Sequence, residues 1–554
     1  MCSVKGRGFT IKSVQKYLIG KIKPISEAFT LNIISALLTV YVPYITGNLF
    51  DELISKPNMD VIYRFCIYLA VLMVVMLGVG YIGARISAGV KTELSYEMNY
   101  DMLCHIQNSS LKLTSEIDPT YVNHRINCDV NTVISFTLEI ITSSTINVIK
   151  LIVLLAFFIA VNLRLAAIIL ILDVFYLFFF LFLKEKLEKV KAVLKETGNR
   201  YYKSLQEQIA NIKFIRALSL KEYYHGRLGK SYFRLKRGIF ADINVNYGLK
   251  IGESALQTLA QIAIFVVGGV GLLNRSITIG TFTILINYLN MIIGGTNYCI
   301  SVGNSFVDAK IAYRRLGEFG DIPEDGAGTM EVGHFDTMEF QGVSFGYTEP
   351  VINGFSYSFM KGSVYALCGA NGAGKTTLLD IMAGLYPGQY EGAVYIDGFD
   401  LDDIDGTELR KVNISYCMQR AEIAGEDIMG NITLSRQDYD AKRLRWLAEG
   451  FGLWHLLSRF CGGTEILGDP DLGETELSED MISGGEAQKI SLIRGLLKPD
   501  CDMYIFDEPT NNLDKGSREF FINEITELSR SAMIVIATHD IEMMNACTEV
   551  IEIG

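Results

Sequence analysis

One stretch constrains the fold more than any other: a short apolar run followed by closely spaced glycines, a lysine and a threonine. Val364 to Cys368 has the composition of a buried strand, GANGAGKT follows at Gly369–Thr376, and an apolar-periodic helix comes next. The glycines let the backbone curl so that its N–H groups face a phosphate chain, and the helix N-terminus adds its positive end. A glycine-rich turn can be no more than a turn, but the strand–loop–helix order favours a nucleoside triphosphate site. Lys375 is then expected at the β- and γ-phosphates and the Thr376 hydroxyl on Mg²⁺.

Three further segments extend this site. MYIFDEP is an apolar strand that ends in Asp507, placed to hold Mg²⁺, and Glu508, placed to polarise an attacking water. MIVIATHD is another such strand and ends in His539, a hydrogen-bonding group at the sheet edge where ligands bind in α/β folds. Before both of them in the chain, ISGGEAQKI (Ile482–Ile490) places two glycines at the start of a helix, which suits an anion.

In this order, the segments resemble the nucleotide-binding domain of an ABC transporter, from about His334 to Gly554. The resemblance implies an ATP hydrolase in which Glu508, His539 and Gln419 are catalytic. It implies that Mg²⁺ is held by Thr376, Gln419 and Asp507. It assigns ATP contacts to the glycine-rich loop (Walker A), the signature sequence, the D-loop and an aromatic residue that stacks on adenine: Gly369, Asn371, Gly372, Gly374, Lys375, Thr376, Thr377, Ser483, Gly484, Gly485, Glu486, Asp514 and Tyr347.

The sequence departs from the family pattern at two places. The signature reads ISGGE, whereas the commonest form has leucine first and glutamine fifth. The acidic loop before it is irregular, with only Gly473–Glu474 resembling it. Neither departure removes a catalytic group, so a competent site is expected. For Tyr347, the alternative to adenine stacking is an ordinary tyrosine at the end of a strand.

The first half of the chain has the composition of a membrane domain. Hydrophobic residues make up 49% of the chain and the mean hydropathy is +0.26. Apolar stretches near the ~20 residues needed to cross a bilayer lie at 28–50, 62–83, 140–161, 164–183, 254–273 and 279–301. The net charge of −12 argues against a nucleic-acid binder. The ten cysteines form no CxxC pair, which indicates thiols in a reducing compartment.

Charge predicts the orientation. Cationic residues crowd the N-terminus and the two long connections between spans, whereas the three short loops hold little more than Lys56, Arg164 and Arg275. The positive-inside rule therefore places the N-terminus, the long connections and the ATPase half in the cytosol of a multi-pass protein in the cytoplasmic membrane. No cleavable signal peptide is visible.

Nearly the whole chain thus resembles an ABC exporter half-transporter. The expected fold is an all-α membrane domain of six helices with two long cytosolic extensions (residues 1–309), a linker (310–333) and a cytosolic α/β P-loop ATPase domain (334–554). The resemblance implies short transverse helices that dock on the ATPase, within 113–130 and 204–219, the second against the partner subunit's ATPase. No peptidase domain is expected before the spans.

Several polar residues fall inside the predicted spans. Glu253, Gln257 and Gln261 recur every four residues and so share one face of the fifth helix. Lys150 and Asp173 each fall near the middle of the bilayer, where a charge is costly. Our hypothesis is that these residues line a transport pathway and that Lys150 pairs with Asp173. The alternative is that they form interhelical hydrogen bonds that stabilise packing.

The resemblance implies a head-to-tail dimer in which ATP lies between Walker A of one chain and the signature of the other. The sequence allows a homodimer or a heterodimer with a sister chain. ATP-driven export is the favoured function, with a peptide or bacteriocin as the expected substrate and multidrug or lipid export as the alternative. Six spans exclude a soluble ABC ATPase, and the fusion of both domains argues against an importer. A regulatory membrane ATPase that transports nothing remains a further alternative.

Overall fold

The computed structural model describes residues 11–114, 122–123, 125–325, 328–347, 349–434, 439–460 and 481–553. These residues form two compact units, which are described separately. The first comprises Met1–Cys104 and Pro119–Asp321, and the second comprises His105–Asp118 and Ile322–Gly554. The second unit is therefore built from two separate parts of the sequence.

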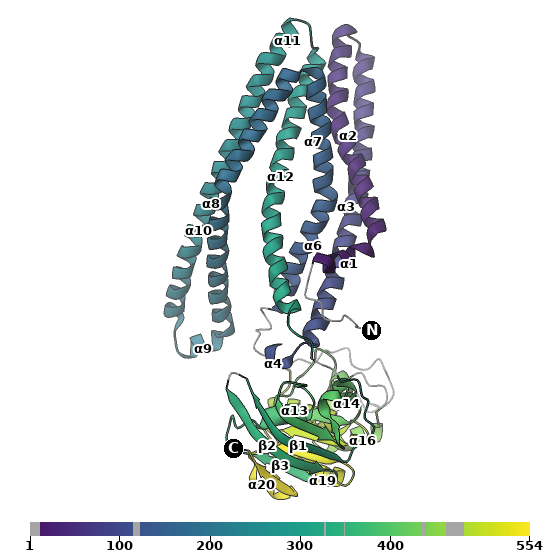
Figure 1. Cartoon of the computed structure of the whole chain (residues 1–554), viewed down its shortest axis with the longest axis vertical. Helices are drawn as coiled ribbons and strands as arrows, with labels where there is room; N and C mark the ends of the chain where they lie inside the picture. The colour runs from purple at the N-terminus through teal and green to yellow at the C-terminus, as the bar shows by residue number, and fades with distance from the viewer. Residues whose placement is uncertain are drawn as a thin grey trace. The chain divides into compact units, whose positions relative to one another are not determined.

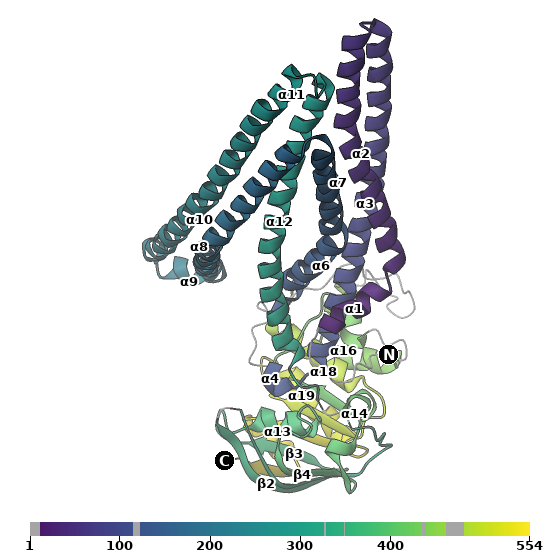
Figure 2. The ribbon, with the colours of Figure 1, turned by 45° about the horizontal axis from the view of Figure 1, so that its top comes forward.

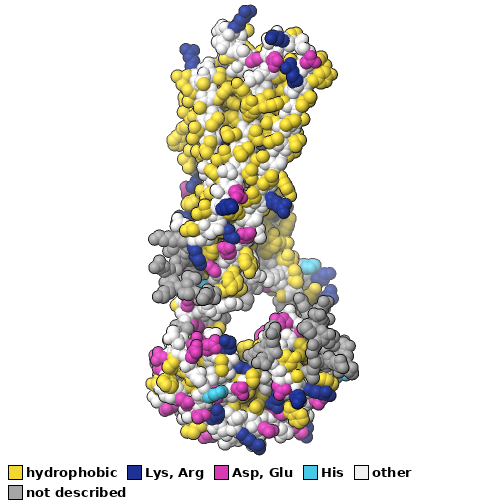
Figure 3. Space-filling model, turned by 90° about the vertical axis from the view of Figure 1, so that its right-hand side faces the viewer, with side chains coloured by type: hydrophobic (Ala, Val, Ile, Leu, Met, Phe, Trp, Pro, Cys, Tyr) yellow, Lys and Arg dark blue, Asp and Glu magenta, His cyan; other side chains and the backbone are white. Residues whose placement is uncertain are grey.

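The first unit is all helical. When helical segments that follow each other without a break are counted as one helix, six described helices are long and apolar enough to cross a membrane. Each predicted span lies within one of them. Figure 3 shows a band of apolar side chains on this unit with charged side chains at its ends. The helices are α1 (Ile11–Ile19), α2 (Ile22–Ser55), α3 (Met59–Gln107), η1 (Arg125–Asp129), α6 (Val130–Glu139), η2 (Ile140–Ser144), α7 (Thr145–Val161), α8 (Leu163–Ala210), α9 (Ile212–Ala217), α10 (Lys221–Ala263), η3 (Ile264–Gly268), α11 (Gly269–Leu273) and α12 (Ile279–Gly320).

Two helix pairs dominate the packing of this unit. Helices α8 and α10 run side by side along most of their length and are joined at one end by α9 (Figures 1 and 2). Helix α12 packs against α2, and their backbones touch where two glycines meet, since a Cβ added to Gly280 would lie 2.1 Å from the Gly47 carbonyl oxygen. A buried cluster from α7, α8, α10 and α12, which includes Phe158, Leu165 and Leu289, holds these elements together.

The long helices continue beyond their apolar stretches as charged segments. On α8, Lys189 lies 2.5 Å from Glu185 and Arg200 lies 2.5 Å from Glu196, both one helical turn apart. Such pairs support a helix in water. Helix α9 lies within the predicted transverse segment 204–219. Helix α12 runs to Gly320, so the first part of the stretch predicted as a linker is helical.

The second unit contains two sheets. The antiparallel sheet has the order β2 (Pro350–Met360), β1 (Thr337–Gly346), β4 (Glu391–Ile396), β5 (Phe399–Asp400). The parallel sheet has the order β6 (Ile414–Cys417), β7 (Met503–Asp507), β8 (Met533–Ala537), β3 (Val364–Cys368), β9 (Glu549–Glu552). Its three central strands, β7, β8 and β3, read as nearly continuous apolar runs because both of their faces are covered.

The two faces of the parallel sheet carry different helices. Successive residues of a strand point to opposite faces. Tyr504 and Phe506 of β7 pack in the cluster that contains α18 (Gly484–Leu496), whereas Met503 and Ile505 pack in the cluster that contains α13 (Lys375–Met382). Helices α13 and α18 therefore lie on opposite faces. The remaining helices of the unit are α4 (Leu111–Thr114), η4 (Leu401–Asp403), α14 (Gly406–Val412), α15 (Ile428–Thr433), α16 (Ala441–Gly450), α17 (Trp454–Phe460), α19 (Lys515–Leu528) and α20 (Ile541–Ala546).

The segment from His105 to Asp118 belongs to the ATPase unit even though it follows the second span. Ser110 donates its N–H to the Pro323 carbonyl (3.0 Å) and its hydroxyl to Gln389 (2.9 Å). Leu111 packs against the cluster that contains α13, and the Asp325 N–H bonds the Asn108 carbonyl (2.9 Å). Helix α4 overlaps the start of the first predicted transverse helix, of which residues 115–121 and 124 lie outside the described part.

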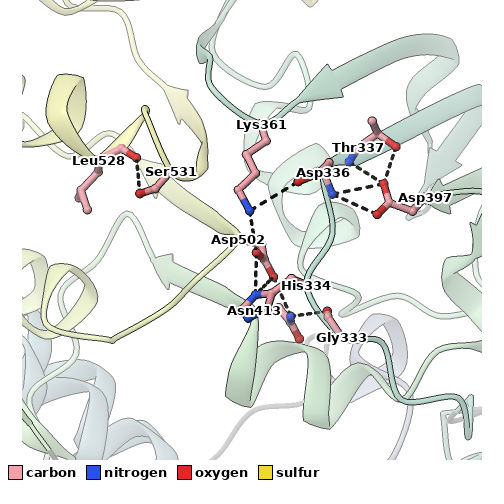
Figure 4. Close-up of polar contacts among 10 residues, drawn as sticks. All are labelled: Gly333, His334, Asp336, Thr337, Lys361, Asp397, Asn413, Asp502, Leu528 and Ser531. Carbon is pink, nitrogen blue, oxygen red and sulfur yellow. Dashed lines mark hydrogen bonds and ion pairs between the residues drawn. The ribbon is translucent and has the colours of Figure 1, made fainter.

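A buried carboxylate fastens the start of β7. Asp502 is 2% exposed and accepts hydrogen bonds from Asn413 Nδ2 (2.8 Å) and Lys361 Nζ (3.2 Å). Nδ1 of His334 lies 3.0 Å from its Oδ1 (Figure 4). Because the partners come from the start of the domain, the β2–β3 turn and the residue before β6, Asp502 joins three separate parts of the unit.

Candidate active site

The parallel register brings four predicted site segments to one edge of the sheet. Leu367 of β3 and Asp507 of β7 both pair with Ala537 of β8, and Cys417 of β6 pairs with Phe506 of β7. The loops that follow these strands carry the glycine-rich loop, Gln419, Glu508 and His539. The carboxyl edge of a parallel sheet is where ligands bind in α/β folds. The prediction that these segments belong to one site thus agrees with the strand order.

The glycine-rich loop adopts a conformation that requires its glycines. Gly369, Gly372 and Gly374 have φ of 153°, 84° and 95°. At Gly369 there is also no room for a side chain, since a Cβ would lie 2.3 Å from the Ile553 carbonyl oxygen.

Lys375 of this loop is 9% exposed and folds back, donating from Nζ to the carbonyls of Gly369 (2.9 Å) and Ala370 (3.2 Å). The curved backbone of the loop thus surrounds the Lys375 ammonium group, an arrangement that suits the binding of a phosphate chain. Asn371 is an exposed member of this loop, and Thr377 is buried in the first turn of α13.

The expected Mg²⁺ ligands Thr376 and Asp507 are in contact. The Thr376 hydroxyl donates to Asp507 Oδ2 at 2.7 Å. Burial raises the pKa of the Asp507 carboxyl and the charge of Glu508 raises it further, whereas the Thr376 hydrogen bond and the Lys375 charge lower it. A hydroxyl and a carboxylate are the hard oxygen donors that Mg²⁺ takes beside nucleotide phosphates, so the residues fit the ion.

Glu508 is held in a strained conformation beside His539. Its φ is 49°, in the left-handed region that non-glycine residues rarely adopt, and its N–H bonds the Ala537 carbonyl (2.8 Å). The side chain is 6% exposed, and Oε2 lies 2.7 Å from His539 Nδ1. That separation suits an ion pair, yet within the described residues Oε2 accepts no hydrogen bond of good geometry. The carboxylate therefore keeps hydrogen-bond acceptor capacity that the described residues do not use.

The other predicted site residues at this edge differ in their surroundings. Gln419 is exposed and lies two residues beyond the end of β6. Tyr347 follows β1 directly, is 38% exposed, and its hydroxyl lies 2.8 Å from that of Tyr386. Phe345 packs edge-on against Tyr347, with ring centroids 5.2 Å apart. Tyr386 was not among the predicted site residues, because nothing in the sequence links two tyrosines 39 positions apart.

The signature sequence starts α18 through a capping box. The Ser483 hydroxyl donates to Glu486 Oε2 (2.7 Å), and the same carboxylate oxygen accepts the Ser483 N–H (2.7 Å). Gly485 packs so closely on the D-loop (Asn511–Asp514) that a Cβ would lie 2.7 Å from the Asn512 carbonyl oxygen. One turn further along α18, Lys489 lies 2.5 Å from Asp514, and this bond lowers the pKa of the Asp514 carboxyl. The irregular acidic loop at Gly473–Glu474 lies outside the described residues.

The structure corrects the predicted pairing of Lys150 with Asp173. Asp173 accepts a hydrogen bond from Thr296 of α12 (3.5 Å), whereas Lys150 faces an apolar hollow between α2 and α7, lined by Leu37 and Val40 among others. Across the described spans no ion pair joins the two charges, because their helices direct them to different neighbours.

The polar stripe on the fifth span makes interhelical bonds. Glu253 accepts from Asn297 Nδ2 of α12 (2.5 Å), and Gln257 donates to Asn290 of α12 (3.3 Å). Tyr176 of α8 adds a bond to Asn297 (3.1 Å). For Glu253 and Gln257 these contacts favour the alternative interpretation, in which the stripe stabilises packing. Gln261 is half-buried on the same helix.

Comparison with known families covers most of the chain. Residues 25–296 match the family model described as ABC transporter transmembrane region. Residues 352–511 match the family model described as ABC transporter.

Known relatives are similar along nearly their full length. The ATP-dependent lipid A-core flippase of Syntrophus aciditrophicus (strain SB) is 22% identical, over 92% of this chain and 84% of the relative. The β-(1→2)glucan export ATP-binding/permease protein NdvA of Rhizobium meliloti (strain 1021) is 21% identical, over 97% of this chain and 89% of the relative. A solved structure of a bacterial Atm1-family ABC exporter with ATP bound has a TM-score of 0.82 at 16% identity and covers 96% of this chain and 94% of its own.

Proposed function

Because the chain belongs to the ABC transporter family, as an exporter-type half-transporter with both domains on one polypeptide, we propose that two chains together export a lipid-like amphipathic substrate across the cytoplasmic membrane. ATP hydrolysis coupled to transport follows from the family. Four features of this function are proposals: the dimer, the bound Mg²⁺, the cytosolic location of the ATPase domain, and the substrate.

The observation that carries the dimer is the placement of α13 and α18 on opposite faces of the parallel sheet. Walker A opens α13 and the signature opens α18. No hydrogen bond or ion pair joins the two motifs in the described part of the chain. One nucleotide therefore cannot be held by both motifs of one chain, and a head-to-tail pair of chains supplies the second set of contacts.

Exposed apolar side chains at the α8–α9–α10 tip also support a partner. Ile212 and Phe214 of α9 are 54% and 50% exposed, and Leu218, just after α9, is 56% exposed. An apolar cluster on a polar extension marks a contact surface. We propose that it docks on the partner subunit's ATPase domain.

Within the proposed site each residue has a separate task. Glu508 orients and deprotonates the attacking water, and His539 holds the carboxylate in place. Lys375 and the loop N–H groups neutralise the phosphates, and Ser483 of the second chain binds from the other side. Thr376 and Asp507 would hold Mg²⁺, with Gln419 as the third predicted ligand, and the ion would neutralise charge on the β- and γ-phosphates.

The substrate class is proposed from the relatives. Their names specify a lipid A-core and a β-(1→2)glucan, and none of those described above specifies a peptide. The peptide or bacteriocin predicted from the sequence thus gains no support. The alternative stated from the sequence is multidrug or lipid export, and we propose lipid export because one relative's name specifies a lipid.

The first test is ATP hydrolysis by this chain, expressed alone, in lipid nanodiscs. We expect two chains per particle and ATP turnover. A folded chain that binds ATP but does not hydrolyse it would show that an obligate sister chain is needed. Inside-out vesicles that take up a labelled lipid A analogue, but neither a peptide set nor a cationic dye, would support the substrate class, and uptake of peptide alone would contradict it.

Replacing Glu486 with glutamine is expected to lower the ATP concentration needed for half-maximal hydrolysis about two- to fivefold. The carboxylate puts a negative charge at the helix N-terminus that would face the phosphates of the second chain's nucleotide, and the field there is worth about 0.3–1 kcal/mol. Glutamine keeps the capping box. Glu449→Gln, on the exposed face of α16, is the control. An unchanged ATP dependence of Glu486→Gln would show that its charge does not reach the nucleotide.

A further inference from the structure

An apolar groove lies at one end of the spans, where α2 ends and α12 begins. Its volume is about 1030 Å³, at the upper end of the range for small-molecule pockets. The walls come from α2, η3, α11 and the turn before α12. Phe265, Val266 and Val270 present apolar surface to it and are each more than half exposed. The ATP site has no part in this groove.

One wall of the groove is fixed. Asp51 at the end of α2 accepts the Thr278 hydroxyl (2.6 Å) and the Gly280 N–H (2.8 Å), so it ties α2 to the start of α12. The contact of Gly280 with Gly47 allows no movement of these helices toward each other. The Asp51 carboxylate is thus occupied by two neutral donors of the protein.

The opposite wall is irregular. The π-helix η3 interrupts the fifth span at Ile264–Gly268, and Phe265 and Val266 of this π-helix line the groove. Such π-bulges occur frequently at functional sites. Gly269 follows, also lines the groove, and has nothing within 4 Å of where its Cβ would lie. There is therefore open space next to this wall at Gly269.

A single cation completes the groove. Arg275 lines it, is exposed, and has a φ of 53°, a strained value for a non-glycine residue. Its N–H bonds the Leu272 carbonyl (3.0 Å), which closes the turn. In the described part of the unit no carboxylate pairs with its guanidinium, since Asp51 is bonded elsewhere. Apolar walls beside a guanidinium that is in no ion pair match an amphipath with an anionic head, because the other charge of the lining, Asp51, is held by Thr278 and Gly280.

We propose that this groove binds a membrane phospholipid with an anionic headgroup, its acyl chain along Phe265, Val266 and Val270 and its phosphate against Arg275. A second copy of the chain fits less well, because its cover would bury the exposed guanidinium, and the Asp51 carboxylate in the same lining is already held by Thr278 and Gly280. A phospholipid supplies both an acyl chain for the apolar walls and a negative charge for Arg275. The proposal does not rest on the exported substrate or on the direction of transport.

The test counts lipids that stay bound to the full chain. The protein is reconstituted in bilayers of equal phosphatidylglycerol and phosphatidylcholine, extracted in mild detergent and analysed by native mass spectrometry. We expect retained phosphatidylglycerol to exceed phosphatidylcholine about fivefold, the preference that one cation near a membrane surface provides. Arg275→Gln is expected to abolish the preference. Arg164→Gln, at the exposed start of α8 in another short loop, is the matched control and should keep it.

Filling the groove gives a second measurement. Gly269→Trp places a large ring where there is open space, so it should displace the lipid of either kind without a backbone clash. Gly78→Trp on α3, where there is equally open space, should not. Equal retention of both lipids by the wild type and Arg275→Gln would overturn the proposal. So would a Gly269→Trp protein that keeps its lipids but loses dimer mass, since the groove would then be a contact between copies.

Discussion

Glu508→Gln is expected to reduce ATP hydrolysis about 100-fold or more while leaving ATP binding intact. Removal of a positioned general base costs about 10²–10⁴ in rate. The amide keeps the size of the side chain, so the strained backbone and the bond from the Glu508 N–H to Ala537 are expected to persist. What is lost is the oxygen that can accept a proton. Phosphate release in nanodiscs and binding of a fluorescent ATP analogue measure the two effects separately.

The control for this variant is another glutamate of the same unit. Glu542 lies on α20, its side chain is 66% exposed, and it has no contact with the glycine-rich loop in the described residues. Glu542→Gln should hydrolyse ATP at the wild-type rate. If Glu508→Gln kept more than a tenth of the activity, another group would have to act as the base.

Asp502→Ala is expected to destabilise the ATPase unit by about 1–3 kcal/mol, the usual cost of leaving a buried polar group, here the Asn413 amide, without its hydrogen-bond partner. The carboxylate is the shared acceptor for Lys361 and Asn413 and lies beside His334 (Figure 4). Without it, the partners left among the described residues are the Gly333 carbonyl for Asn413 Nδ2 and the exposed Asp336, 3.5 Å away, for Lys361.

Tryptophan fluorescence can follow this unfolding selectively. The chain has two tryptophans, and both Trp446 and Trp454 lie in the ATPase unit. Asp336→Ala is the matched control: its side chain is 77% exposed and 3.5 Å from Lys361, so at most about 1 kcal/mol should be lost. Equal denaturation midpoints for Asp502→Ala and Asp336→Ala would show that the buried carboxylate does not fasten β7.

The sequence predicts those parts of the site that depend on local order. Strand, glycine loop and helix follow each other directly at 364–382, so one motif predicts their geometry. Glu508 and His539 meet because each follows a parallel strand, and parallel strands end at the same edge. The six spans are predicted by hydropathy alone, since lipid requires long apolar helices.

What the sequence could not predict depends on which faces of distant elements meet. Lys150 and Asp173 lie on consecutive spans, yet one faces α2 and the other faces α12. Hydropathy does not report the rotation of a helix about its axis. The bond between Tyr347 and Tyr386 likewise depends on tertiary packing. The extension of α12 to Gly320 was missed because a polar helix and a polar linker have similar compositions.

The discontinuous make-up of the ATPase unit affects how the chain can be cut for work on a soluble fragment. A fragment that starts at Ile322 would lack residues 105–118. The Pro323 carbonyl and the Asp325 N–H would each lose a backbone partner, and the apolar surface that Leu111 covers would face water. Such a fragment should aggregate more readily than one that keeps residues 105–118. Joining residues 105–118 to Ile322 through a flexible linker would restore the cover and is a better starting point for expression of the excised domain.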